Sequence, residues 1–181
     1  MNGSRTEIDV HLCEFEKCKV EQMARIAFRD NLVYVTLASY GAIIAFAAKD
    51  NHLALLVLPW VSLVLGWGYL VNDEKVSAIG RYIRIDLTNR VAPLINVQNP
   101  EEIFRWEVVH RSDPRRFRRK LQQLVIDMIT FVLSGFAALA AFWILDPGTQ
   151  CLLRAVAGVE ALLLLVLGIE FFSYADLKSG R

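Results

Sequence analysis

Between positions 72 and 120 the chain reads NDEKVSAIGRYIRIDLTNRVAPLINVQNPEEIFRWEVVHRSDPRRFRRK, a polar stretch between two long apolar blocks. The block before it, residues 53–71, and the block after it, residues 121–145, are each long enough to cross a bilayer. The polar stretch holds 11 of the 20 Lys and Arg residues of the chain. Because flanking Lys and Arg resist translocation, we expect this stretch to lie on the cytoplasmic face of a membrane.

The composition also indicates a membrane protein. Hydrophobic residues make up 55% of the 181 residues and the mean hydropathy is +0.37, which is high for a soluble domain. These residues are gathered in four blocks, at 31–48, 53–71, 121–145 and 152–172. No recognisable nucleic-acid-binding module accompanies the basic residues, so we expect no nucleic-acid partner. The first 29 residues mix acids and bases and lack the apolar region of a signal peptide.

The four blocks predict an all-α fold with four transmembrane helices, arranged as two antiparallel hairpins. The first hairpin is expected at residues 31–72, with a tight turn at 49–52, and the second at residues 121–173, with a turn at 146–148. Residues 1–30 predict an amphipathic cytoplasmic helix that starts near Val10 and continues into the first span. Residues 73–120 predict a basic cytoplasmic helical segment, and residues 174–181 a cytoplasmic tail.

Helix boundaries inside the polar stretch follow from its Asn, Asp and Pro residues. The second span is expected to continue as an amphipathic helix to about Asn89, ending before Pro93. A proline inside that span, Pro59, is a candidate kink. Asn99 followed by proline and two acids is a strong helix start, and that helix is expected to end near Arg111. Asp113 followed by proline repeats the signal and starts the helix that becomes the third span.

The placement of the basic residues predicts the orientation. The N-terminal segment holds 5 Lys and Arg residues, the polar stretch 11 and the tail 2, which leaves only Lys49 and Arg154 near the two turns. Both termini are therefore expected in the cytoplasm. A small-residue face on the first span is typical of close helix packing and favours a homo-oligomer. That face consists of Ala38, Gly41, Ala42 and Ala45.

Glu160 is the most informative single residue, because it lies about nine residues into the fourth span. At 1.5 Å per residue this is about 13 Å deep, near the middle of the bilayer. A charge at this depth costs about 2.5–3.5 kcal/mol on insertion scales, so the side chain needs a partner, a water-filled cavity or a proton. One interpretation is a ring of Glu160 carboxyls that lines a cation or proton path in an oligomer. The other is a protonated carboxyl that bonds to a neighbouring helix.

Two further acidic residues are candidates for an intramembrane polar site. Asp127 lies six residues into the third span and Glu170 two residues before the end of the fourth. Antiparallel helices would bring them to a similar depth, as an acidic vestibule near the cytoplasmic side. The alternative is that Asp127 reaches back towards the basic cluster that precedes it. Paired carboxylates can perform acid–base chemistry, but no nucleophile or metal motif accompanies them.

The basic residues are candidates for binding an anionic lipid head group or a phosphate-bearing ligand. Runs of four to eight juxtamembrane bases favour anionic lipids, and Arg suits bidentate phosphate contact. The alternative is a plain positive-inside anchor. The residues concerned are Arg115, Arg116, Arg118, Arg119, Lys120, Arg81 and Arg84.

No motif predicts a reaction. His11, Cys13 and Cys18 have a spacing that matches no common zinc site, and a fourth ligand is missing. The chain contains no Gly-rich phosphate loop, HExxH or Gly-x-Ser-x-Gly motif. We therefore expect no catalytic residue, no metal and no cofactor.

One local pattern resembles a known group of proteins. Residues 65–73 read LGWGYLVND and residues 79–84 read IGRYIR. This combination of Gly-Trp, Asn-Asp and Ile-Gly-x-Tyr-Ile resembles small four-span bacterial integral membrane proteins of uncharacterised function. The resemblance covers about 20 residues and implies no catalytic residue. At greater distance the layout is similar to the multi-span membrane effectors of bacterial nucleotide-signal immune systems, which implies membrane permeabilisation.

Three hypotheses follow. The first is a non-enzymatic, oligomeric inner-membrane protein that forms a pore or perturbs the membrane, gated through its cytoplasmic helices. The second is a membrane anchor or scaffold that docks a soluble cytoplasmic protein through apolar residues such as Phe15, Met23 and Trp106. The third is a small transporter or a lipid-modifying enzyme that uses Asp127 and Glu170.

Overall fold

The computed structural model describes residues 2–49, 51–146, 148 and 150–175, and the described residues contain no strand. The predicted all-α class is confirmed. Asp50 and Pro147 of the two predicted turns, and residues 176–181 of the predicted tail, lie outside the described residues. By its contacts the chain divides into two compact units. Unit 1 comprises Met1–Phe28 and Asn72–Arg116, and unit 2 comprises Arg29–Val71 and Phe117–Arg181.

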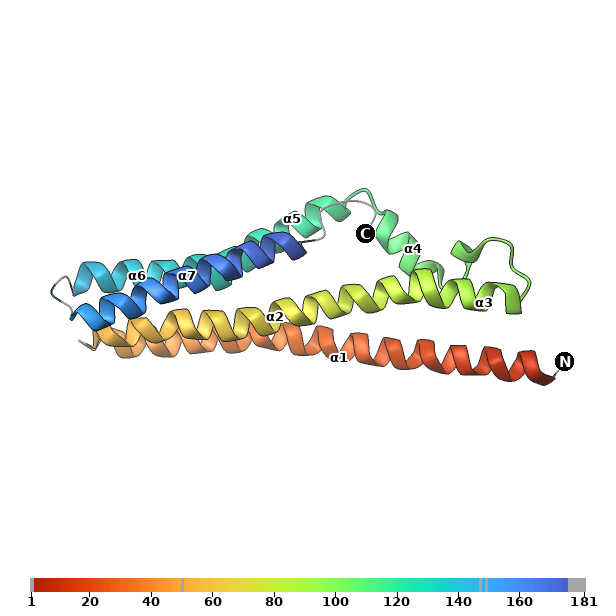
Figure 1. The fold of residues 1–181 in the computed structure, drawn as a ribbon, viewed down its shortest axis with the longest axis horizontal. Helices are drawn as coiled ribbons and strands as arrows, with labels where there is room; N and C mark the ends of the chain where they lie inside the picture. The colour runs from red at the N-terminus through yellow and green to blue at the C-terminus, as the bar shows by residue number, and fades with distance from the viewer. Residues whose placement is uncertain (1, 50, 147, 149, 176–181) are drawn as a thin grey trace. The chain divides into compact units, whose positions relative to one another are not determined.

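The first helix, α1 (Asn2–Ala47), is uninterrupted (Figure 1). The prediction that the N-terminal helix continues into the first span is therefore confirmed. The predicted start near Val10 is wrong, because the helix begins eight residues earlier, at Asn2. Residues 2–10 contain no proline, and each residue added to an existing helix gains a backbone hydrogen bond at little cost.

The second apolar block begins with a short 3-10 turn, η1 (His52–Leu56), which is followed by α2 (Val57–Tyr82). Pro59 is the third residue of α2, and the helical run from His52 to Leu94 continues through it. Helical structure then continues through a π-helical turn, η2 (Ile83–Leu87), into α3 (Thr88–Leu94). The Thr88 hydroxyl donates to the Ile83 carbonyl at 2.7 Å, which satisfies an acceptor of the wider turn.

The predicted helix end near Asn89 is wrong, since Pro93 lies inside the last turn of α3. Burial explains the extra turn. Val91 is 3% exposed and belongs to a cluster with the fully buried Ile83 and Leu87. Burying such aliphatic side chains is worth about 1.5–3 kcal/mol each, which outweighs the disfavoured helical conformation before a proline.

The predicted helix from Asn99 to about Arg111 is interrupted. Asn99 caps the start as expected, because its side chain accepts from the Glu101 N–H at 3.2 Å, but η3 (Pro100–Glu102) is a single 3-10 turn. Phe104 then adopts a left-handed conformation, φ 51°, before α4 (Arg105–Ser112). The left-handed backbone turns the Phe104 ring onto Phe15 of α1, with the ring centroids 4.1 Å apart. Aromatic stacking across unit 1 thus replaces a continuous helix.

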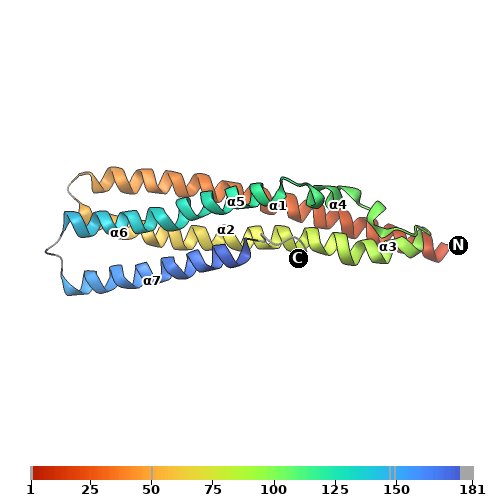
Figure 2. The same ribbon diagram turned by 90° about the horizontal axis from the view of Figure 1, so that it is seen from above.

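The third apolar block consists of α5 (Arg116–Asp127), a π-helical segment η4 (Met128–Leu133) and α6 (Ser134–Leu145). Its predicted start is confirmed, since the Asp113 carboxylate accepts from the Arg115 N–H at 2.8 Å. The π-helical segment was not predicted. The fourth block is α7 (Cys151–Tyr174), which packs against α6 (Figure 2).

Unit 2 has an apolar interior and an apolar exterior. Its fully buried side chains include Phe131, Phe142 and Leu164. Outside, Ile144 is 77% exposed and Leu152 71% exposed. Soluble proteins rarely leave apolar surface of this extent in water. Within the part of the chain that the structure describes, four helical segments are long and apolar enough to cross a membrane, as predicted, namely Glu7–Ala47, His52–Leu94, Arg116–Leu145 and Cys151–Tyr174.

Two glycines allow the helices of unit 2 to approach closely. A Cβ atom on Gly66 of α2 would lie 3.0 Å from Leu167 Cδ2 and 3.0 Å from Phe131 Cβ. A Cβ atom on Gly135 would lie 2.7 Å from Leu164 Cδ1. Small residues at such contacts are typical of helices that associate in lipid, where dispersion contacts replace the hydrophobic effect as the driving force.

Candidate functional site

Glu160 lies inside unit 2 on the buried side of α7. Its side chain is 0% exposed, and neither carboxyl oxygen has a hydrogen-bond partner among the described residues. Ala157 and Leu164, one turn away on either side, are buried in the apolar core. The indole N–H of Trp60 on α2 interacts weakly with the carboxyl but falls short of hydrogen-bond geometry. An unsatisfied buried polar group of this kind costs about 1–3 kcal/mol, so it is a feature that folding alone does not explain.

A cluster of hydroxyl groups lies within unit 2 where α1, α2 and η4 meet. The Tyr40 hydroxyl is 2.6 Å from Ser62 Oγ and donates to the Thr130 carbonyl at 2.9 Å. Ser134 Oγ lies 2.9 Å from the same hydroxyl and 2.5 Å from the Thr130 carbonyl. Thr130 belongs to the π-helical segment, whose wider turn makes its carbonyl available to side chains. Every oxygen of this cluster has a partner, in contrast to those of Glu160.

Asp127 lies at the end of α5 beside a second polar cluster. It is 7% exposed, and its carboxylate interacts with the hydroxyl of Tyr69. That hydroxyl also accepts from the Gln123 amide at 3.3 Å, and the Arg29 guanidinium lies 5.7 Å from the centre of the Tyr69 ring. The structure thus places Asp127 beside Tyr69. Glu170, which was predicted to share a vestibule with Asp127, is half-buried, and no interaction between the two carboxylates is present among the described contacts.

Unit 1 holds a polar contact between α1 and α2. The Tyr82 hydroxyl donates to Glu14 Oε1, and His11 Nδ1 lies 3.5 Å from Glu14 Oε2. The hydrogen bond from Tyr82 lowers the pKa of the Glu14 carboxyl, with smaller contributions from His11 and Arg90. The same bond raises the pKa of Tyr82. These groups stabilise the packing of unit 1.

The predicted basic site is spread over both units. Arg81 and Arg84 belong to unit 1, as do Arg115 and Arg116, whereas Arg118, Arg119 and Lys120 belong to unit 2. Most of these side chains are exposed, and the Arg84, Arg116 and Lys120 side chains are half-buried. On α5 the half-buried Lys120 shares a face with Asp127, since seven residues make about two helical turns. The prediction of an anionic ligand at these residues stays a prediction.

Sequence reasoning identified Glu160 and Asp127 but missed the hydroxyl cluster around Tyr40. Tyr40, Ser62 and Ser134 come from three different apolar blocks, and a lone hydroxyl in an apolar block is common because it can bond to its own helix. Only the packing brings the three hydroxyls together. The available signal was that each lies roughly in the middle of its block.

Among the described residues, no group of three or more His, Cys, Asp or Glu side chains is placed to hold a metal ion. Comparisons of the chain with protein-family models, with curated proteins and with solved structures found no match. The resemblance to small four-span bacterial membrane proteins therefore stays a prediction. The function is therefore inferred from the residues of this chain, and above all from Glu160.

Proposed function

We propose that this chain is a multi-pass protein of the bacterial inner membrane, with four spans in two antiparallel hairpins. Unit 1 and both termini lie in the cytoplasm. The apolar exterior of unit 2 supports insertion, because side chains such as Ile144 and Leu152 are exposed unless lipid covers them. The orientation is supported by the positive-inside rule, since 18 of the 20 Lys and Arg residues fall on the proposed cytoplasmic side.

The spans assemble with further copies of the chain. The support is the small-residue face of α1, which the described residues of unit 2 leave exposed. Ala38, Gly41, Ala42 and Ala45 are all exposed, and a Cβ atom on Gly41 would meet nothing within 4 Å. Small residues on one helix face allow backbones of neighbouring helices to approach closely in lipid.

The assembly conducts protons or small cations, and Glu160 is the residue that controls conduction. The observation that carries this proposal is a carboxyl group with 0% exposure and no hydrogen-bond partner, near the middle of a candidate span. The closed bundle tolerates this carboxyl when it is neutral. Ionisation costs about 2.5–3.5 kcal/mol at this depth unless water or a cation reaches the group, so ionisation favours a more open, hydrated bundle. The proposed activity is transport of an ion across the membrane, which involves no covalent step.

The test is an ion-flux measurement on full-length protein reconstituted in lipid vesicles that contain a pH-sensitive dye. We expect a flux that rises from acidic to alkaline buffer as Glu160 ionises. Glu160→Gln keeps the shape of the side chain but cannot ionise, so its flux should stay at the level of empty vesicles. Glu170→Gln, a half-buried carboxyl on the same helix, is the matched control and should behave as the wild type. Equal flux from wild type and Glu160→Gln at every pH would contradict the proposal.

A second candidate function is a membrane anchor for a soluble cytoplasmic protein, and a surface of unit 1 favours it. Trp106 on α4 is 70% exposed and Val109, one turn later, is 51% exposed. Exposed aromatic residues of this kind are typical of protein interfaces. Wild type and Trp106→Ala would be compared for co-purification of a single cytoplasmic protein. A partner lost in Trp106→Ala but kept in Glu160→Gln would favour the anchor over the conduction proposal.

A further inference from the structure

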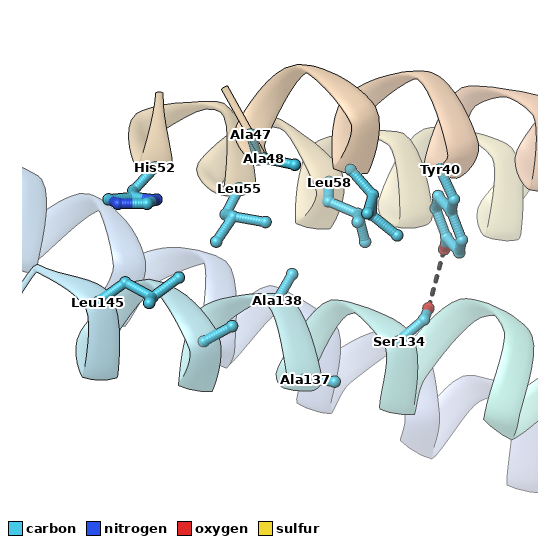
Figure 3. A pocket seen from close by; sticks show the side chains of 12 residues that line it. Tyr40, Ala47, Ala48, His52, Leu55, Leu58, Ser134, Ala137, Ala138 and Leu145 are labelled. Carbon is cyan, nitrogen blue, oxygen red and sulfur yellow. Dashed lines mark hydrogen bonds between the residues drawn. The ribbon is translucent and has the colours of Figure 1, made fainter. Parts of the chain in front are cut away.

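Three hydroxyl groups from three helices form a line inside unit 2. Ser134 Oγ at the start of α6 lies 2.9 Å from the Tyr40 hydroxyl on α1, and Figure 3 shows this bond crossing between the two helices. The Tyr40 hydroxyl in turn lies 2.6 Å from Ser62 Oγ on α2. Each oxygen is within hydrogen-bond distance of the next, so a proton can hop along this hydroxyl line while the oxygens stay in place.

The hydrogen bonds of the hydroxyl line can reverse direction, because its three hydroxyls have more acceptors than protons. Ser134 Oγ lies 2.5 Å from the Thr130 carbonyl, and the Tyr40 hydroxyl reaches the same carbonyl at 2.9 Å. Ser62 Oγ lies 3.0 Å from the Leu58 carbonyl. With the two bonds inside the line these make five contacts for three protons. Each hydroxyl can therefore turn its proton from a carbonyl to a neighbouring hydroxyl, which is the step that resets a relay after each proton.

The hydroxyl line lies between two buried carboxyl groups. Among the described residues of unit 2, Asp127 and Glu160 are the acidic side chains that are buried. Asp127 precedes Ser134 by seven residues along the third apolar block, which is about 10 Å at 1.5 Å per residue. Acidic residues inside membrane spans often belong to proton relays. A proton that leaves Asp127 thus reaches the Ser134 end of the line first.

Glu160 lies beyond the other end of the line, near Ser62. The helices α2 and α7 run in the same direction (Figure 1), and Gly66 of α2 packs against Leu167 of α7. Counting back four residues places Ser62 level with about residue 163, which is about 5 Å from Glu160 along the helix axis. Trp60, two residues before Ser62, interacts with the Glu160 carboxyl. Ser62 is therefore the end of the line that serves Glu160.

We propose that the hydroxyl line is a proton relay between Asp127 and Glu160. The proposal rests on the proposed conduction through Glu160, and it identifies the conducted ion as the proton. At each oxygen one O–H bond forms as a proton arrives and another breaks as a proton leaves. Each hydroxyl thus keeps one proton, and the net result is transfer of one positive charge. A metal cation cannot follow this route, because it needs a passage wide enough for the ion and its oxygen ligands.

Water completes the relay on both sides of the hydroxyl line. At a hydrogen-bond distance of about 2.8 Å, one water bridges the gap of about 5 Å towards Glu160, and about three waters bridge the gap of about 10 Å towards Asp127. Ionisation of Glu160 favours a hydrated bundle, as proposed above, and so admits these waters. The relay therefore operates when Glu160 is ionised, which couples the path to the group that controls conduction.

The test compares proton flux and sodium flux through full-length protein in lipid vesicles at alkaline pH. A pH-sensitive dye reports protons, with valinomycin and potassium present to balance charge, and a sodium-sensitive dye reports sodium in separate vesicles. We expect the wild type to carry protons and no sodium. Tyr40→Phe removes the middle oxygen of the line and should lower proton flux by about tenfold or more, since a positioned proton-transfer group contributes on the order of 10²–10⁴-fold to the step it serves.

Matched variants separate proton transfer from packing. Ser134→Ala removes a hydroxyl of the line and should lower proton flux as Tyr40→Phe does. Ser134→Thr keeps a hydroxyl on the same carbon and should restore most of the flux that Ser134→Ala loses. Ser39→Ala is the control on α1, because the Ser39 hydroxyl donates to the Val35 carbonyl of its own helix at 2.8 Å and lies outside the line. It should conduct as the wild type does.

The outcomes distinguish failure of the relay from failure of conduction. Proton flux that depends on Glu160 but is unchanged in Tyr40→Phe and Ser134→Ala would overturn the relay alone. Equal loss in Ser134→Ala and Ser134→Thr would also overturn it, because the hydroxyl would then not be the group that matters. Sodium flux equal to proton flux in the wild type would assign the path to cations. Equal proton flux from wild type and Glu160→Gln would instead overturn conduction through Glu160, and the relay with it.

Discussion

Replacing Glu160 with methionine should raise thermal stability while it abolishes ion flux. Methionine has a similar volume and no unsatisfied polar atoms, and volume-conserving substitutions are well tolerated in cores. The substitution removes two carboxyl oxygens that are buried without a partner, which relieves about 1–3 kcal/mol. For a chain of this size each kcal/mol shifts Tm by about 2–4 °C, so we expect Tm to rise by about 2–12 °C.

The assay is tryptophan fluorescence during heating of detergent-solubilised protein, together with the vesicle flux measurement. Glu160→Gln serves as the comparison. Its amide group occupies the same buried position and also lacks a hydrogen-bond partner, so Tm should stay near the wild-type value. A residue kept at a cost to stability is expected where function requires it. A lower Tm for Glu160→Met than for wild type would refute the reasoning, since it would mean that the carboxyl has a stabilising partner.

Three further substitutions test the packing within the two units. Tyr40→Phe removes the hydroxyl bonded to Ser62 and Thr130 in unit 2 and should lower Tm by about 2–12 °C, corresponding to about 1–3 kcal/mol, in the same heating assay. Gly66→Ala places a Cβ 3.0 Å from side chains of two other helices and should lower Tm by a similar amount. Tyr82→Phe removes the hydrogen bond that lowers the pKa of Glu14 in unit 1. Because the pKa of Glu14 is lowered in the folded protein, its ionised carboxyl stabilises unit 1 at pH values above the ordinary glutamate pKa of 4.5. This stabilisation is lost as the pH falls below 4.5 and through the lowered pKa. Circular dichroism should therefore show a weaker loss of helix on acidification in Tyr82→Phe than in wild type.

Each of these substitutions has a control or a contradicting result. Tyr34→Phe alters a tyrosine that is 71% exposed and should leave Tm unchanged. Gly158→Ala adds a Cβ into open space on α7 and should raise Tm slightly, because alanine favours a helix by about 0.8–1.0 kcal/mol over glycine. Identical acid unfolding of wild type and Tyr82→Phe would contradict the role assigned to the Tyr82–Glu14 bond.

The helices themselves could be predicted from the sequence because their signals are local. Four apolar blocks gave four helices long enough to cross a membrane, and Asn99 and Asp113 cap helix starts where the pattern indicated. Local signals failed where tertiary contacts dominate. Phe104 leaves the helical conformation to stack on Phe15, and α3 extends past the predicted end because Val91 is buried with Ile83.

The site was predictable only in part, for the same reason. Glu160 stands out in the sequence because placing a charged carboxyl in the middle of an apolar block costs free energy whichever way the helix is turned. Its burial inside unit 2 follows from the rotation of α7 about its axis, which depends on contacts with other helices. The hydrophobic pattern likewise does not predict the π-helical segment Met128–Leu133. That segment provides the Thr130 carbonyl, which accepts hydrogen bonds from the Tyr40 and Ser134 hydroxyls.

The proposed function depends on insertion of the four helices in the membrane with both ends of the chain on the inner side. The native cysteines test this directly, because Cys13 in the N-terminal part of α1 and Cys151 at the start of α7 are both exposed. Variants that retain Cys13 or Cys151 as their only cysteine, with Cys18 also replaced, would be treated in intact spheroplasts with a maleimide that cannot cross membranes. The account predicts that Cys151 is labelled at once and Cys13 only after the membrane is permeabilised. Labelling of Cys13 in intact spheroplasts, or protection of Cys151 there, would contradict it.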